Sequence, residues 1–151
     1  MAARYWVGGT ASWDAIAGTK WATTSGGAGG AAVPTSTDDV FFDAASGSGT
    51  VTVTVANPAQ SLNFTGFTGT FAGTFALTLS GSLTLASGMT YTYSGGISFN
   101  ATATITTAGK SLANSVTIVA TGGTVTLADA LTTSRTFSVT AGTFSTGASG
   151  Y

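Results

Sequence analysis

The chain of 151 residues contains no cysteine and no histidine. Without cysteine, disulfide bonds and thiolate metal sites are excluded. Without histidine, imidazole metal ligands and a Ser-His-Asp catalytic triad are excluded as well. The sequence therefore lacks the two residue types that most often carry metal binding and proton transfer near neutral pH. We expect no cofactor and no metal ion.

Charge is almost as scarce, with four Lys or Arg, five acidic residues and a net charge of −1. From Ala44 to Tyr151 the only charged side chains are Lys110, Asp129 and Arg135. Four scattered cations do not form the basic stripe that nucleic-acid binding requires. One carboxylate in that region leaves no pair of facing acids for glycoside hydrolysis. We therefore expect neither nucleic-acid binding nor enzyme activity.

The sequence also lacks a long apolar run and a recognisable leader. No segment approaches the roughly 20 apolar residues of a membrane helix. The N-terminal residues from Met1 to Trp6 show no apolar stretch followed by a cleavage site, so no secretory signal peptide is recognised. We expect no membrane insertion, and a location in a virion or on a cell surface that is reached by lysis, by a non-Sec route or with a leader not shown in this sequence.

Thr, Ala, Gly and Ser predominate, but the composition is that of a folded chain. Disordered chains are poor in aromatic and β-branched residues and usually carry a high net charge. Here 43% of the residues are hydrophobic and 11% are aromatic. Because near-neutral charge also gives little repulsion between copies, we expect the protein to work inside an assembly of its own copies or of other structural proteins.

The chain divides into two regions of different texture. Residues 1–43 hold all three Trp and four of the five Asp, and we predict an N-terminal cap there. Residues 44–151 form a Thr-rich region with an imperfect repeat, and the two regions together are expected to form one structural domain. Gly-marked turns divide the repeat into units 50–73, 74–96, 97–123 and 124–147. The units open on alternating runs such as Thr50-Val-Thr-Val-Thr54.

Repeats of this length built from short strands and Gly turns are typical of solenoids, in which each coil buries the apolar face of its neighbour. We therefore predict an all-β fold: a β-solenoid, specifically a parallel right-handed β-helix, of about four coils with the N-terminal aromatic cap. A β-sandwich is the alternative, since it also uses short alternating strands. Alternation predicts the inward side chains. They are Val51, Val53, Val55, Leu62, Phe64, Phe75, Leu77, Leu79, Leu83, Leu85, Ile97, Phe99, Val116, Ile118, Val125, Leu127, Phe137 and Val139.

The N-terminal region carries a recognisable order of motifs. Arg4-Tyr-Trp-Val-Gly-Gly-Thr10 is followed by Trp13-Asp14, Lys20-Trp21, a Gly-rich loop, Pro34 and Asp38-Asp-Val-Phe-Phe42. This order resembles the opening module of phage tail and virion-associated β-helical repeat proteins, and is similar to the corresponding segment of autotransporter-like surface β-helix proteins. The resemblance continues into phrases such as Leu62-Asn-Phe-Thr-Gly-Phe67. It implies a structural role without catalytic residues.

The aromatic residues Tyr5, Trp6, Trp13 and Trp21 have two interpretations. The first coil of a solenoid exposes an apolar cross-section and unpaired strand edges, which large aromatic side chains can cover. The alternative is an aromatic platform that binds a glycan. The cap is favoured, because the Trp residues lie beside Gly turns at the predicted start of the stack.

Asp38, Asp39 and Asp43 surround the start of one predicted strand. Calcium binding would require six to eight oxygen ligands on a tightly turned loop. Hydrolysis would require two opposed carboxylates, one with a raised pKa. Three Asp residues around a single strand start instead indicate turn and cap roles.

Thr-x-Thr phrases occur at 50–54, 90–92, 102–106 and 124–126. Rows of outward Thr on a flat solenoid can order water, as on the surface of an ice-binding protein. A plain Thr ladder on a solvent face is the alternative, because β-branched residues suit strands. The starts of the phrases are irregularly spaced along the chain, which favours the plain ladder.

The sequence thus predicts a structural, non-enzymatic protein of a virion, tail fibre or surface assembly that self-associates through stacked β structure. A glycan-binding module that uses the N-terminal Trp cluster is the alternative.

Overall fold

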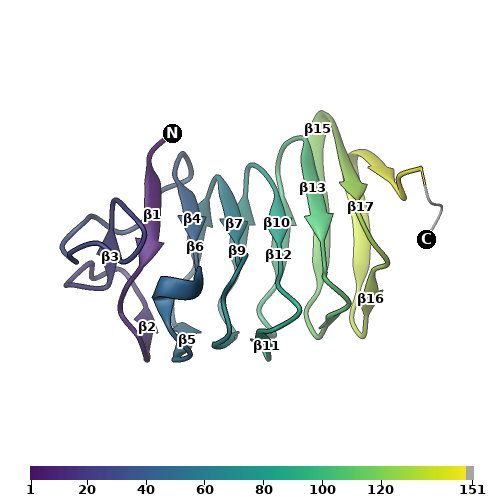
Figure 1. Ribbon diagram of the computed structural model, residues 1–151. Coiled ribbons are helices and arrows are strands. Elements are labelled where there is room, and N and C mark those ends of the chain that lie inside the picture. Colours follow the sequence, from purple (N-terminus) through teal and green to yellow (C-terminus); the bar gives the residue numbers. More distant parts are fainter. Residues whose placement is uncertain (149–151) are drawn as a thin grey trace.

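The protein is a β-solenoid of stacked parallel coils with about five turns. The structure is a computed structural model and describes residues 1–148, so the end of the predicted region 44–151 lies outside the described residues. In Figure 1 the coils follow one another along a single axis, with β1 near one end of the stack and β17 at the other. The all-β prediction is confirmed, and the sandwich alternative is wrong because the strands stack in parallel.

Each complete coil has three faces, and the strands of one face stack in register. The first face consists of β1 (Ala3–Trp6), β4 (Asp39–Phe41), β7 (Ser61–Asn63), β10 (Leu83–Thr84), β13 (Ala103–Thr106) and the second half of β15 (Val116–Leu127). The second face consists of β2 (Ala11–Trp13), β5 (Thr50–Val53), β8 (Thr70–Gly73) and β11 (Thr90–Tyr91).

The third face consists of β6 (Asn57–Ala59), β9 (Leu77–Leu79), β12 (Ile97–Phe99) and the first half of β15. The remaining elements are β3 (Trp21–Ala22), the short 3-10 helix η1 (Ala44–Ser46), β14 (Ser111–Leu112), β16 (Thr132–Thr133) and β17 (Phe137–Ser145). β15 runs around the corner between the third and first faces, and β17 pairs with both of its halves.

The coils are shorter than the units predicted from Gly. Leu77 pairs with Ile97, 20 residues later, and Leu83 pairs with Ile105, 22 residues later. The predicted units of 23 to 27 residues were too long, because Gly occurs at several bends of one coil and does not mark where a coil ends. β1 and β2 also pair in parallel with β4 and β5, so strands within residues 1–43 belong to the same stack.

Side chains inside the stack form ladders along the axis. On the first face Val40, Leu62, Leu83, Ile105 and Leu127 follow one another in register, and all are buried. A coil buries little apolar surface by itself, so the stability of each rung depends on its neighbours in the next coils. The core is therefore one continuous cluster that reaches from Trp6 to Leu127.

Alternation predicted most of this core and failed at bends and at the last coil. Val55 is half-buried and Phe75 is 49% exposed. Phe75 lies in the bend between β8 and β9, where the strand pattern is interrupted. Phe137 and Val139 pair with the inward residues Val116 and Ile118, but no further coil within residues 1–148 covers them. The prediction omitted Phe42, Phe67, Phe71, Met89, Tyr93, Ile105 and Leu112, which are buried.

Candidate functional site

The three Trp residues lie inside the N-terminal end of the stack. Trp6, Trp13 and Trp21 are all 0% exposed. Trp21 packs edge-on against Trp6 and Trp13, with ring centroids 5.0 and 5.3 Å apart, and all three contact Phe42. Aromatic side chains in this arrangement close an apolar cross-section. Fully covered indoles present no surface on which a sugar ring could stack.

Tyr5 lies elsewhere, on the outer surface of the first face. Its ring stacks on that of Phe41 with centroids 4.8 Å apart and an interplanar angle of 16°. The two residues pair across β1 and β4, and both are half-buried. The four aromatic residues of the predicted platform therefore do not lie together. The three Trp residues are buried inside the stack, and Tyr5 stacks on Phe41 at the outer surface.

The three Asp residues of the predicted cluster do not converge. Asp43 caps η1, where its carboxylate accepts hydrogen bonds from the N–H groups of Ala45 (2.9 Å) and Ser46 (3.2 Å). Asp39 points outward on the first face. Among residues 1–148, no group of three or more acidic, His or Cys side chains could hold a metal ion.

Asp38 is 5% exposed and fixes the turn before β4. Its carboxylate accepts hydrogen bonds from the N–H (3.0 Å) and Oγ1 (2.8 Å) of Thr35, and Arg4 lies 3.9 Å away. Burial by itself would raise the pKa of Asp38. The Thr35 hydrogen bonds and the Arg4 charge outweigh burial and hold that pKa below its usual range. This carboxylate is therefore ionised and engaged in holding a turn.

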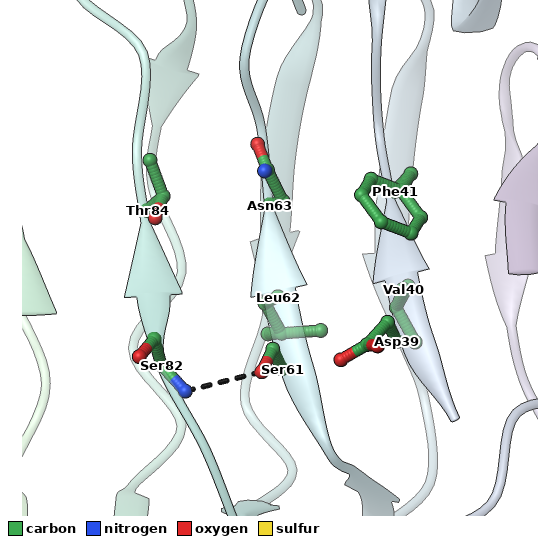
Figure 2. Close-up of a pocket in the computed structure, with 8 residues that line it drawn as sticks. All are labelled: Asp39, Val40, Phe41, Ser61, Leu62, Asn63, Ser82 and Thr84. Carbon is green, nitrogen blue, oxygen red and sulfur yellow. Dashed lines mark hydrogen bonds between the residues drawn. The ribbon is translucent and has the colours of Figure 1, made fainter. Parts of the chain in front are cut away.

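A shallow groove of about 250 Å³ crosses the first face, over β4, β7 and β10. Figure 2 shows its two edges. One edge is formed by Asp39, Ser61 and Ser82, and the other by Phe41, Asn63 and Thr84. The groove follows the solenoid axis, because equivalent outward residues of successive coils lie in register.

The groove combines one aromatic ring with several polar groups. Among the described residues no hydrogen bond joins the Asp39 carboxylate to another side chain. The Asn63 Oδ1 accepts from the Thr65 N–H (2.8 Å), and its amide Nδ2 makes no hydrogen bond to the part of the chain that the structure describes. Ser61 Oγ accepts from the Ser82 N–H (3.2 Å). A carboxylate on one edge, with an amide and an aromatic ring on the other, is an arrangement suited to a polyhydroxylated ligand.

The sequence prediction missed this groove, although one signal was available. In Val40-Phe-Phe42 the alternation that buries Val40 and Phe42 must place Phe41 outside. The position of Asn63 beside it depends on the pairing of β4 with β7, which the chain alone does not specify.

Apolar side chains are exposed in the last coil of the described residues. Val139 is 45% exposed, and Phe137 and Phe144 are only partly buried, with ring centroids 4.6 Å apart. β17 pairs with β15 on one side, and within residues 1–148 no strand pairs with its other side. The last coil therefore combines an apolar cross-section with a free strand edge, which is a template for further pairing.

Comparison with protein-family models, curated proteins and solved structures finds no match. Within the described residues, no helix is both long and apolar enough to cross a membrane. The class of protein that the fold defines is a β-solenoid of stacked parallel coils with an aromatic cluster among its buried residues.

Proposed function

We propose that this protein is a non-enzymatic structural component of a virion, tail fibre or surface assembly, and that the last coil of its described residues binds the same coil of a second copy. The exposed inward ladder of the last coil is the observation that supports this proposal. Elsewhere in the stack, residues in the same ladders, such as Val116 and Ile118, are fully buried by the next coil.

A second copy suits this end for two reasons. The free edge of β17 offers unpaired N–H and C=O groups in a row, and the same edge of another copy is their direct complement in a two-fold arrangement. The net charge of −1 opposes this approach only weakly. The N-terminal end is not equivalent, since its aromatic residues are already covered.

The virion or surface location rests on the resemblance of the N-terminal motifs. A structural role is further supported by the engagement of the carboxylates. Asp38 and Asp43 hold turns, and Asp129 accepts two backbone hydrogen bonds from the preceding coil.

Size-exclusion chromatography with light scattering over a concentration series tests the self-association. We expect a dimer for the unchanged protein and a monomer for Val139→Lys, because a charge would enter the apolar interface. Ile16→Lys is the control: Ile16 is 70% exposed and lies in the N-terminal region, so this variant should remain dimeric. A monomer at every concentration, or a dimer of folded Val139→Lys, would reject the proposal.

A glycan-binding role is the second candidate, and the groove over β4, β7 and β10 is the observation that favours it. Sugar rings stack on aromatic faces, and their hydroxyl groups bind carboxylates and amides. Here the ring is that of Phe41, with Asp39 and Asn63 beside it, rather than the ring of any Trp residue.

A glycan array probed with matched variants tests this candidate. Phe41→Ala should lose binding, whereas Phe75→Ala, which removes an exposed aromatic residue outside the groove, should keep it. Circular dichroism would verify that both variants are folded. An unchanged protein that binds no glycan, or equal binding by both variants, would exclude the groove as a glycan site.

A further inference from the structure

The second face carries a regular array of outward Thr side chains. Its first row contains Thr50, Thr70 and Thr90, which pair across β5, β8 and β11. Its second row contains Ser12, Thr52 and Ala72, which pair across β2, β5 and β8, and continues with Thr92, whose N–H bonds to the carbonyl of Phe71. We call these seven residues the Thr array.

The irregular spacing of the Thr-x-Thr phrases along the chain disappears in space. The phrases that start at 50 and 90 lie two coils apart on one face, and Thr70-Phe-Ala72 occupies the coil between them. The phrases at 102–106 and 124–126 contribute Thr104 and Thr126 to the first face. The spacing along the chain looked irregular because it compared phrases that lie on two different faces of the solenoid.

Among the described residues, the Thr92 hydroxyl donates a hydrogen bond to the Phe71 carbonyl (3.5 Å), and the other hydroxyl groups of the array are free to bind water. Within the described chain, the side chains of Thr50, Thr52, Thr70 and Thr90 make no hydrogen bond to protein atoms, and all four reach the solvent. On the first face, by contrast, Ser61 and Ser82 accept hydrogen bonds from the N–H groups of Ser82 and Thr104 in the next coils. Outward Thr84 on the first face and Thr78 on the third likewise make no side-chain hydrogen bond within the described residues. The second face differs in carrying two adjacent rows without a charged or aromatic side chain.

The array is also repetitive. The pairings of β2, β5, β8 and β11 contain no register shift. Neighbouring strands lie about 4.8 Å apart, and outward residues within one strand lie about 6.7 Å apart. A rigid backbone therefore presents hydroxyl and methyl groups on a two-dimensional lattice with two fixed repeats.

We infer that the Thr array binds the surface of an ice crystal. A lattice of fixed hydroxyls, each beside a methyl group, can hold a layer of water in a regular arrangement. An ordered water layer joins the surface of an ice crystal more readily than a disordered water layer does. The seven residues of the array carry no ionisable side chain, and the Lys20 ammonium that bonds the Ser12 carbonyl (3.0 Å) at its end is neutralised by Asp14. The array contains no outward aromatic ring, so it lacks the stacking platform of a polysaccharide site.

This inference does not depend on the proposed self-association, because the array lies on the side of the solenoid rather than at its C-terminal end. Thermal hysteresis, the gap between the melting and freezing temperatures of a single ice crystal, measures the activity directly. We expect the unchanged protein to open a gap and to shape the crystal into facets.

Matched variants locate the activity. Thr70→Lys should abolish the gap because it places a long charged side chain at the centre of the array. Thr78→Lys makes the same change on the third face, where Thr78 pairs between Pro58 and Ser98, and it should leave the gap unchanged. Ala72→Thr completes the second row and should widen the gap, an increase that unfolding cannot produce.

The absence of a gap with the unchanged protein would overturn the inference. So would equal losses in folded Thr70→Lys and Thr78→Lys, or an Ala72→Thr variant no more active than the unchanged protein. Thermal unfolding followed by circular dichroism would confirm that each variant retains the fold.

Discussion

The carboxylate of Asp129 holds Ala108 in a left-handed backbone conformation one coil earlier. Its Oδ2 accepts a hydrogen bond of 2.7 Å from the Ala108 N–H, and its Oδ1 accepts one of 2.7 Å from the Thr107 N–H. Ala108 has φ 51°, and among the described residues it is the only residue other than Gly with positive φ. Such a conformation costs a non-Gly residue about 1–2 kcal/mol, which the two charge-assisted hydrogen bonds offset.

Asp129→Ala should therefore destabilise the solenoid, because it leaves two backbone donors without their acceptor. We expect a loss of about 1–3 kcal/mol in the free energy of unfolding, measured by chemical denaturation. Asp39→Ala is the control, since the Asp39 carboxylate makes no hydrogen bond within the described residues, and it should change stability by less than about 0.5 kcal/mol. Equal losses for the two variants would contradict this role of Asp129.

Two buried Trp residues should respond differently to the same substitution. Trp6 Nε1 donates a hydrogen bond of 3.0 Å to the Gly9 carbonyl, whereas Trp13 Nε1 is buried and has no hydrogen-bond partner among residues 1–148. Trp6→Phe loses a hydrogen bond, but Trp13→Phe removes an unsatisfied donor. Denaturation should show Trp6→Phe to be the less stable variant by about 0.5–1.5 kcal/mol. A Trp13→Phe variant less stable than Trp6→Phe would contradict the prediction, because the hydrogen bond of Trp6 Nε1 would then not decide the difference in stability.

Glycine is required where backbones of adjacent coils approach most closely. A Cβ atom at Gly95 would lie 2.2 Å from the Phe75 carbonyl oxygen, whereas at Gly88 the nearest atom would be 3.7 Å away. Gly95→Ala should therefore lower stability by about 1–3 kcal/mol through overpacking. Gly88→Ala should be neutral or slightly stabilising because it restricts the unfolded chain. Melting temperatures of the two variants test this, and a tolerated Gly95→Ala would refute the close approach.

Acid should weaken the turn before β4. The pKa of Asp38 is lower in the folded protein than the ordinary value of about 3.9, because hydrogen bonds from Thr35 and the charge of Arg4 outweigh burial. The stabilisation is therefore fully present above the unfolded-state pKa and is lost as the pH falls through the folded-state pKa. Denaturation of the unchanged protein and Asp38→Asn over this acid range should show their stabilities converging. A difference that stays constant with pH would exclude this linkage.

The placement of Tyr5, Phe41 and Asn63 shows how much of the candidate site was predictable. Alternation around Val40 already places Phe41 outside. The stacking of Tyr5 on Phe41, and the position of Asn63 beside them, depend on which strands pair and in which register. Pairing of this kind joins residues about one coil apart, and Gly-rich strands specify their register only weakly in the sequence.

Composition and alternation indicate an all-β fold without thiol or imidazole chemistry, and the repeat favours a solenoid over a sandwich, because these patterns govern which side chains a strand buries. Which outward residues become neighbours depends on how the coils stack. The coil length of about 20 residues brings Thr50, Thr70 and Thr90 into one row and leaves Val139 uncovered at the last coil. The row of Thr residues and the exposure of Val139 both result from stacking, because the side chains of each coil contact only those of the coils before and after it.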